Sequence, residues 1–280
     1  MTLLEITSVN ARRTIIALAF ALIGPAPRAA AQEPARDPHD VQPERPTVAT
    51  HAGTVATGWF ELETGIEDDQ VGPSAHSYIT PTLLKIGLAS TLQVGIFAQL
   101  SDPSGAGPGL GDVGANLKWR LANGLPVLGD FAVLPSLKVP TGSATAGRGT
   151  GTTDASLVAI SSHDFGPVEM DLNAGYTRRS GNGSVAPRNA TLWTGSLGGT
   201  VAGALGWAAE VYGYPATSGP AGQSAIVALL AGPTLLARAW WAFDAGIIVP
   251  MRGPQPHAIY AGTVYNIGHL WGTPTAAGPR

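Results

Sequence analysis

The sequence predicts an all-β fold, namely a transmembrane, antiparallel, up-and-down β-barrel of about 12 strands preceded by a cleaved signal peptide. Three observations predict it. Segments of about ten residues alternate between apolar and polar side chains, an export signal precedes them, and short turns alternate with longer loops between them. These are the sequence features of bacterial outer-membrane barrels.

The alternation is clearest in residues 168–177, which are apolar at every even position and polar or glycine at every odd one. Successive side chains of a strand point to opposite faces, so such a strand has one apolar and one polar face. We expect twelve strands of this kind, at residues 55–66, 79–88, 92–100, 113–121, 131–139, 154–161, 168–177, 192–201, 205–214, 224–231, 241–249 and 259–267.

The connections between these segments sort by parity. Those after the second, sixth and eighth segments are short, whereas residues 101–109, 140–151, 178–189 and 215–223 form longer, Gly- and Pro-rich loops after odd-numbered segments. Bacterial barrels have short periplasmic turns and long external loops, and an even strand count places both chain ends in the periplasm. The turns after the fourth and tenth segments are longer than this scheme prefers, so counts of ten or fourteen strands also fit.

The N-terminus has the pattern of a secretory signal. Arg12 and Arg13 precede nine apolar residues at 15–23, and Ala29 and Ala31 form an A-x-A cleavage site. Nine residues are too few to span a hydrocarbon core of about 30 Å as a helix. We therefore expect a signal peptide at 1–31, a Pro-rich periplasmic linker at 32–52, the barrel at 53–270 and a C-terminal tail at 271–280.

Composition excludes several classes of function. Charged residues make up 12% of the chain, about half the share in soluble domains. The net charge of −3 argues against nucleic acid as a partner, and the absence of cysteine excludes disulfides and thiolate catalysis. A chain in a membrane without a long apolar segment must be a closed barrel, because unpaired strand edges are not tolerated in lipid.

Alternation also assigns the two faces. Val113, Leu117 and Trp119 would meet lipid, and a charge on that face costs about 2–4 kcal/mol near the midplane for Arg or Lys. The opposite face would line a narrow lumen, crossed by salt bridges that either contact a solute or only brace the interior. The lumen-lining candidates are Glu61, Glu63, Lys85, Asp112, Asn116, Lys118, Arg120, Lys138, Asp154, Glu169, Asp171, Asn173, Glu210, Tyr212 and Asp244.

No motif in the chain indicates catalysis. The Gly-rich stretches 107–111 and 147–151 lack the Gly-Lys-Ser/Thr ending of a phosphate loop, and the six histidines are scattered. The pair Ser162-His163 falls in an expected periplasmic turn without an orienting acid nearby. We therefore expect no catalytic residues, no cofactor and no metal.

Four short stretches resemble a family of outer-membrane barrels associated with the meta-cleavage pathway of phenol degradation. They are residues 110–121, the Pro-Thr-Gly loop at 137–142 with Gly149 to Gly151 and Asp154, Glu44-Arg45-Pro46, and residues 61–65. Members of that family are described as transporters or channels for aromatic and other hydrophobic compounds, so the resemblance implies that role here. The chain departs from other barrels at its C-terminus, where a polar tail follows Leu270-Trp271 instead of a terminal aromatic residue.

The leading hypothesis is thus a channel of the Gram-negative outer membrane for passive passage of small hydrophobic or aromatic compounds. Its partners would be membrane lipid, the solute and the outer-membrane assembly machinery. Two alternatives remain at this point. One is a lipase-type enzyme with Ser and His adjacent on the outer surface, and the other is a sealed structural or adhesin-like barrel.

Overall fold

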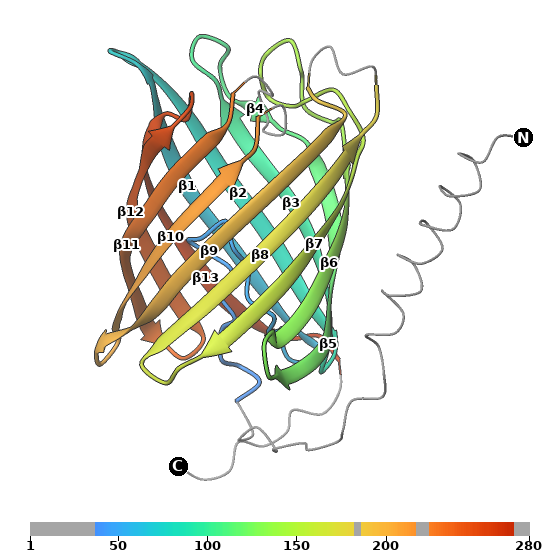
Figure 1. The fold of residues 1–280 in the computed structure, drawn as a ribbon, viewed down its shortest axis with the longest axis vertical. Coiled ribbons are helices and arrows are strands. Elements are labelled where there is room, and N and C mark those ends of the chain that lie inside the picture. Colours follow the sequence, from blue (N-terminus) through green and yellow to red (C-terminus); the bar gives the residue numbers. More distant parts are fainter. Residues whose placement is uncertain (1–36, 182–185, 217–223, 272–280) are drawn as a thin grey trace, which may run out of the picture. The chain divides into compact units, whose positions relative to one another are not determined.

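A computed structural model describes residues 37–181, 186–216 and 224–271. All regular structure in these ranges is β-structure (Figure 1). The strands are β1 (Trp59–Gly72), β2 (Ala75–Ala89), β3 (Leu92–Asp102), β4 (Gly109–Leu110), β5 (Val113–Leu125), β6 (Gly129–Val139), β7 (Asp154–Asp164), β8 (Val168–Arg179), β9 (Asn189–Ala202), β10 (Leu205–Tyr214), β11 (Ile226–Arg238), β12 (Trp241–Arg252) and β13 (His257–His269).

The sheet closes on itself. Each long strand pairs antiparallel with its neighbours in sequence, β1 pairs with both β2 and β13, and the β2–β3 pairing completes the ring. β4 has two residues and pairs only with β3, so the wall consists of twelve long strands. This confirms the prediction of an antiparallel, up-and-down barrel of about 12 strands.

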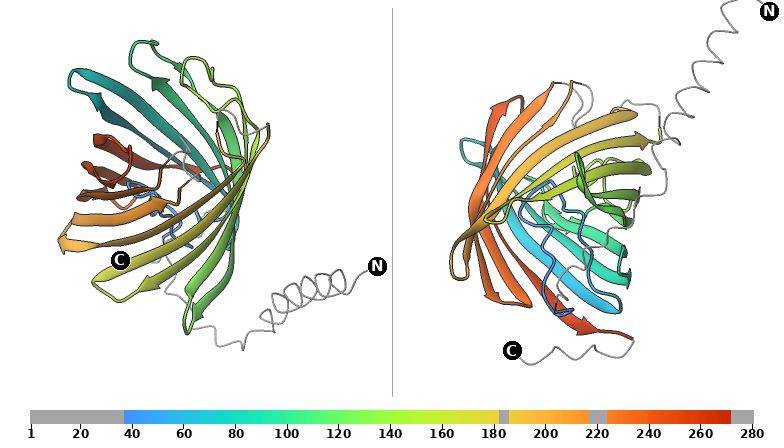
Figure 2. Two further views of the ribbon diagram at one scale, coloured as in Figure 1. Left: turned by 45° about the horizontal axis from the view of Figure 1, so that its top comes forward. Right: turned by 60° about the horizontal axis from the view of Figure 1, so that its bottom comes forward.

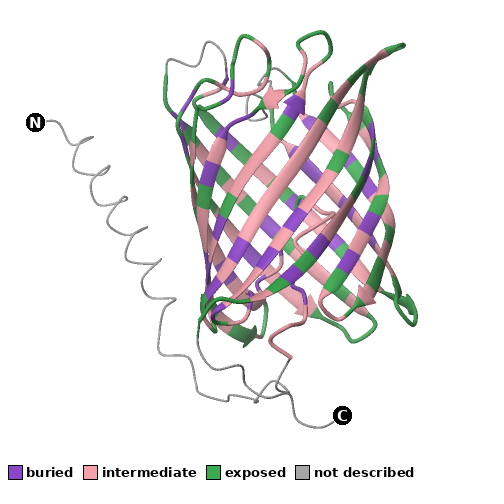
Figure 3. Cartoon of the chain, turned by 180° about the vertical axis from the view of Figure 1, so that it is seen from behind, coloured by how far each residue is buried: buried purple, intermediate pink, exposed green. Residues whose placement is uncertain are grey.

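The exterior of the barrel is apolar. Leu172 and Tyr176 on β8 are 44% and 48% exposed, whereas Asn173 between them is 6% exposed. Figure 3 shows the same alternation of exposed and buried positions along the other strands. An apolar outer band around a closed antiparallel ring is what the hydrocarbon of a bilayer requires. The fold and the exterior are those of a protein of the Gram-negative outer membrane.

Two groups of connections differ from the sequence-based expectation. Residues 67–78 were expected to form a long loop, but β1 and β2 continue to Gly72 and Ala75 as one hairpin. The loop was expected because acidic residues replace the apolar ones there, and a strand that extends past the lipid has no need of an apolar face. The turns after β5 and β11 are shorter than expected, at residues 126–128 and 239–240, and fit the alternation of short turns with long loops.

The end of the barrel with the short turns also holds the start of β1 and the end of β13, and we call it the periplasmic end. The expected signal peptide at 1–31 and the tail beyond Trp271 lie outside the described residues. Within the described part of the chain, no helix is long and apolar enough to cross a membrane.

Candidate functional site

Residues 37–56 lie inside the barrel. Figure 2 shows this segment, in blue, within the ring of strands. Val41, Ala49, Ala52 and Val55 are at most 3% exposed. We name residues 37–56 the plug. The sequence predicts a periplasmic linker over residues 32–52. The described part of that range, residues 37–52, lies instead in the lumen, where side chains of the wall bind it through the contacts given below.

The plug has no regular secondary structure, so its backbone N–H groups need partners from the wall. Carboxylates on the lumenal face provide several. The N–H of Gln42 donates to Glu61 at 2.8 Å, and the N–H groups of Val48 and Ala49 donate to the two oxygens of Glu210 at 2.7 Å each. These acids therefore hold the backbone of the plug in one register.

Neutral side chains of the wall bind the second half of the plug, at residues 50–55. Asn173 accepts from the N–H of Thr50 at 2.7 Å and donates from Nδ2 to the Thr50 carbonyl at 2.9 Å. Ser162 and Gln93 accept the N–H groups of Ala52 and Val55 at 2.8 and 2.9 Å. The contacts come from β8, β7 and β3, so the segment is bound around the circumference of the lumen.

Two fully buried lysines hold the plug at its base. Lys118 Nζ lies 2.7 Å from Glu44 Oε1 and donates to Thr50 Oγ1 and to the His51 carbonyl at 2.8 and 2.9 Å. Lys85 Nζ lies 2.6 Å from Glu61 Oε1 and also binds Glu63 and the Gln42 carbonyl. Cations of the wall thus bind Glu44 and carbonyl oxygens of the plug, and the plug completes their coordination.

Two titratable groups of the plug respond to this environment. Burial alone would raise the pKa of the Glu44 carboxyl, but the ammonium groups of Lys118 and Lys85 outweigh it and hold the pKa well below its usual range. Burial, together with the charge of Lys118, lowers the pKa of His51 to about 3. At neutral pH the docked plug therefore has an ionised Glu44 and an uncharged His51. A further ion pair joins Arg45 Nη2 to Asp244 Oδ1 at 3.0 Å.

A second group of charges lies in the outer half of the lumen. Lys138 binds Asp112 and lies 3.3 Å from Asp154, and Arg179 Nε lies 3.5 Å from the same Asp154 oxygen. Asp112 also accepts the N–H groups of Gly142 and Thr150 at 3.1 Å each. The charges alternate along this row, which ties the external loop 140–153 to the wall.

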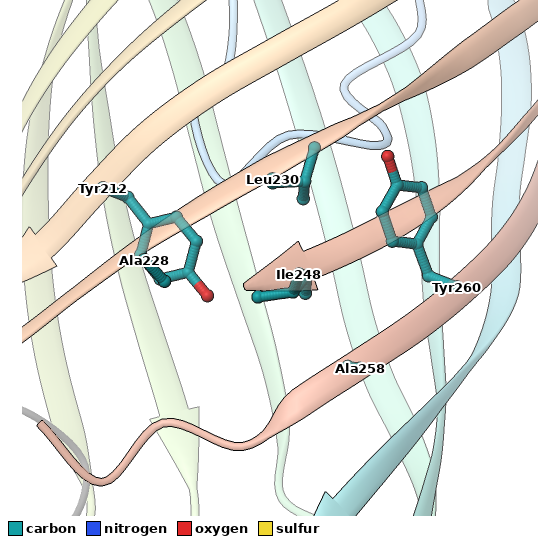
Figure 4. Close-up of a cluster of buried hydrophobic side chains, with 6 residues drawn as sticks. All are labelled: Tyr212, Ala228, Leu230, Ile248, Ala258 and Tyr260. Carbon is teal, nitrogen blue, oxygen red and sulfur yellow. The ribbon is translucent and has the colours of Figure 1, made fainter. Parts of the chain in front are cut away.

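Farther around the ring of strands, the lumenal face has an apolar patch. Tyr212, Ala228, Leu230, Ile248, Ala258 and Tyr260 form a buried cluster over β10 to β13 (Figure 4). Tyr214 packs against it. The outer half of the lumen therefore has a row of charged residues over β5 to β8 and an aromatic and aliphatic patch over β10 to β13.

The candidate residues divide into three sets. Those that contact the plug are Glu61, Glu63, Lys85, Lys118, Asn173, Glu210 and Asp244. Those of the outer half are Asp112, Lys138, Asp154 and Tyr212. Asp171 accepts from the Ser162 hydroxyl at 2.5 Å, Arg120 donates to the Ser90 carbonyl at 3.0 Å, Asn116 is half-buried beside Gly95, and Glu169 is exposed at the periplasmic end.

The salt bridges of the lumen join adjacent strands, or join the wall to the plug and to the base of the external loop. Lys118 pairs with Glu44 of the plug, and Lys138 pairs with acids on neighbouring strands and at the loop base. Sequence reasoning missed the plug itself, Gln93 and Arg179. The lumen-lining candidates themselves contained a signal for the plug. They include eight acids and only four cations, so four acids need hydrogen-bond donors from another part of the chain.

One Ser–His pair lies on the outer face of β7. Ser161 Oγ and His163 Nε2 are 3.1 Å apart, and the Ser161 hydroxyl donates to the Leu128 carbonyl at 2.7 Å. Because the single hydroxyl proton is used there, His163 donates to Ser161, which is opposite to the role of a general base. The Ser162 hydroxyl likewise donates to Asp171. Within the described residues, no group of three or more His, Cys, Asp or Glu side chains is placed to hold a metal ion.

Solved structures of outer-membrane channels share this fold. The COG4313 outer membrane channel from Pseudomonas putida F1 superposes with a TM-score of 0.55 over 81% of this chain and 99% of that one, at 13% identity. The KdgM porin and the NanC porin each superpose with a TM-score of 0.50 over 74% of this chain and 99% and 98% of theirs, at 10% and 12% identity. No protein-family model matches the sequence, and no curated protein matches it significantly. At these identities the likeness concerns the fold.

Proposed function

We propose that the protein is an outer-membrane channel for the passive passage of small hydrophobic or aromatic compounds. The observation that carries the proposal is the outer half of the lumen, where a buried tyrosine-containing patch on β10 to β13 and a row of charged residues on β5 to β8 line the same interior. Pockets with apolar walls and a few placed polar groups are typical of small-molecule sites. The porin-like fold supports the channel role, and the resemblance to the phenol meta-pathway family supports the class of solute.

Passage then requires the plug to leave the periplasmic half of the lumen. Its buried apolar side chains are few and small, namely Val41, Ala49, Ala52 and Val55. Most of its other contacts are hydrogen bonds and ion pairs, whose partners water can solvate once the segment moves. The plug is therefore held by directional contacts that are exchangeable with water, and only to a small extent by burial of apolar surface.

The test is a comparison of conductance in planar bilayers and of solute uptake in liposomes. The mature protein and a variant that lacks residues 37–56 are reconstituted at equal density, and uptake of phenol and of glucose is followed. We expect the deletion to raise the conductance severalfold and, after subtraction of uptake by protein-free liposomes, to admit phenol in preference to glucose. A deletion variant that is as tight to ions and solutes as the empty bilayer would refute the proposal.

A sealed structural barrel is the second candidate, and the plug favours it. Buried Lys85 and Lys118 bind the plug in the periplasmic half, which would close the lumen permanently if the segment never left. The two functions differ in the intact protein. A channel shows transient openings in single-channel records that vanish when a disulfide is engineered between plug and wall, whereas a sealed barrel shows none in either form.

A further inference from the structure

A cavity of about 270 Å³ lies in the outer half of the lumen, against β6 to β10. Its apolar lining includes Phe97, Leu192 and Tyr214, and its polar lining includes Ser156, Lys138 and Arg179. The Phe97 ring lies across Gly114, where a Cβ atom would come within 2.2 Å of the ring. The glycine thus lets an aromatic ring reach over the neighbouring strand and form one side of the cavity.

The two cations of this cavity differ in their coordination. Lys138 Nζ has its donors committed to Asp112, Thr150 and the Thr152 carbonyl. Arg179 donates from Nη1 to the Pro187 carbonyl at 2.9 Å, but among the described residues its Nε has no hydrogen-bond partner. The Arg179 side chain is 9% exposed. A buried N–H of a guanidinium group that lines the cavity is therefore left without a hydrogen-bond partner among the described residues.

The neighbouring acid does not fill this role. Asp154 Oδ2 is 3.5 Å from Arg179 Nε, beyond good hydrogen-bond geometry, and Asp154 Oδ1 already accepts from the Thr152 hydroxyl at 2.6 Å. Arginine is the side chain best matched to a planar carboxylate, which it binds through paired N–H donors. The apolar lining on the other side of the cavity matches the body of a ring.

We propose that this cavity is a binding site for a small aromatic carboxylate, with the carboxylate at Arg179 and the ring between Phe97 and Tyr214. This rests on the proposed channel function and names a class of solute within it. The site selects an aromatic acid over the corresponding alcohol, because only the acid supplies a charged acceptor to the guanidinium group.

The test is fluorine NMR of the mature protein in detergent micelles, titrated separately with 4-fluorobenzoate and 4-fluorobenzyl alcohol. We expect the acid to bind at least tenfold more tightly than the alcohol. Arg179→Gln should weaken the acid about tenfold or more and leave the alcohol within twofold, and Arg179→Lys should fall between. Phe97→Ala should weaken both ligands by a similar factor.

Arg178→Gln is the matched control, since Arg178 is the neighbouring residue but is exposed and donates to Asn189. Equal affinity of wild type for acid and alcohol, or equal loss in the Arg178 and Arg179 variants, would overturn the proposal. Binding does not require passage, so the two proposals fail separately. A barrel that binds the acid but passes no solute refutes only the channel, and one that passes phenol but does not prefer the acid refutes only the carboxylate site.

Discussion

Replacing Lys118 with methionine should release the plug. Lys118 Nζ is within 2.9 Å of three plug oxygens, those of Glu44, Thr50 and His51, and is fully buried. Removing one partner of a buried ion pair costs about 3–5 kcal/mol because the other charge is left unpaired. Lys85 still lies 3.8 Å from Glu44 and offsets part of this, so we take the lower end. At about 1.4 kcal/mol per tenfold change, docking weakens by about two powers of ten.

The assay is hydrogen exchange of the plug amides, read by mass spectrometry on peptides covering residues 42–55. Exchange there should accelerate by about the same factor while the β-strand amides remain protected. Lys138→Met is the control, because it removes a lumenal lysine whose partners are Asp112, Asp154, Thr150 and Thr152 of the outer half. Plug exchange in Lys118→Met within twofold of wild type would refute the argument that this lysine anchors the plug.

Three further predictions concern the same segment. His51 has a pKa of about 3 when docked, so the docked state binds fewer protons than the free plug and docking should weaken up to about tenfold per pH unit below 6.5. This is read as a fall in the protection factor of the plug amides, that is, exchange corrected for its intrinsic rate at each pH, and His51→Gln should reduce the dependence between pH 6.5 and 5. The lowered pKa of Glu44 adds a second loss only below 4.5, and a protection factor that rises on acidification would contradict both signs. Gly87→Ala places a Cβ atom 2.2 Å from the Ala56 carbonyl oxygen, so it should loosen the end of the plug by about 1–3 kcal/mol. The expected result is faster proteolysis of residues 37–56, whereas Gly72→Ala should leave the rate of proteolysis unchanged. Glu210→Gln should raise exchange at residues 48 and 49 about tenfold and leave residue 55 unchanged.

The wall of the barrel was predictable because its physics is local. On β5, Lys118 is fully buried and its neighbour Trp119 is 51% exposed, as an alternating pattern between water and lipid requires. The same rule failed at the outer end of β1, where Glu67 to Gln70 pair with β13 although the pattern of apolar residues has ended. Strand pairing persists there through backbone hydrogen bonds, which a side-chain pattern does not report.

The plug was not predictable from its own sequence. Residues 37–56 have no period, and their partners are scattered from Glu61 to Asp244, so no local rule connects Arg45 with an acid 199 residues away. The available signal was the excess of acids on the lumenal face. An unpaired carboxylate in a narrow lumen needs donors, and backbone N–H groups of an irregular segment are donors that a count of charged residues omits.

Polar anchoring of the plug has a consequence for its motion. A plug held by a large apolar surface would expose that surface to water whenever it left the lumen. The matching apolar surface of the wall would be exposed to water as well. Here the wall presents Glu61, Glu210 and Lys118, which water solvates readily once they are free. Buried ion pairs add little net stability compared with apolar packing of the same volume, yet each needs one geometry to be satisfied. A segment held in this way is fixed in a single register while docked and is separated from the wall at modest cost, which is the combination a reversible closure of the lumen needs.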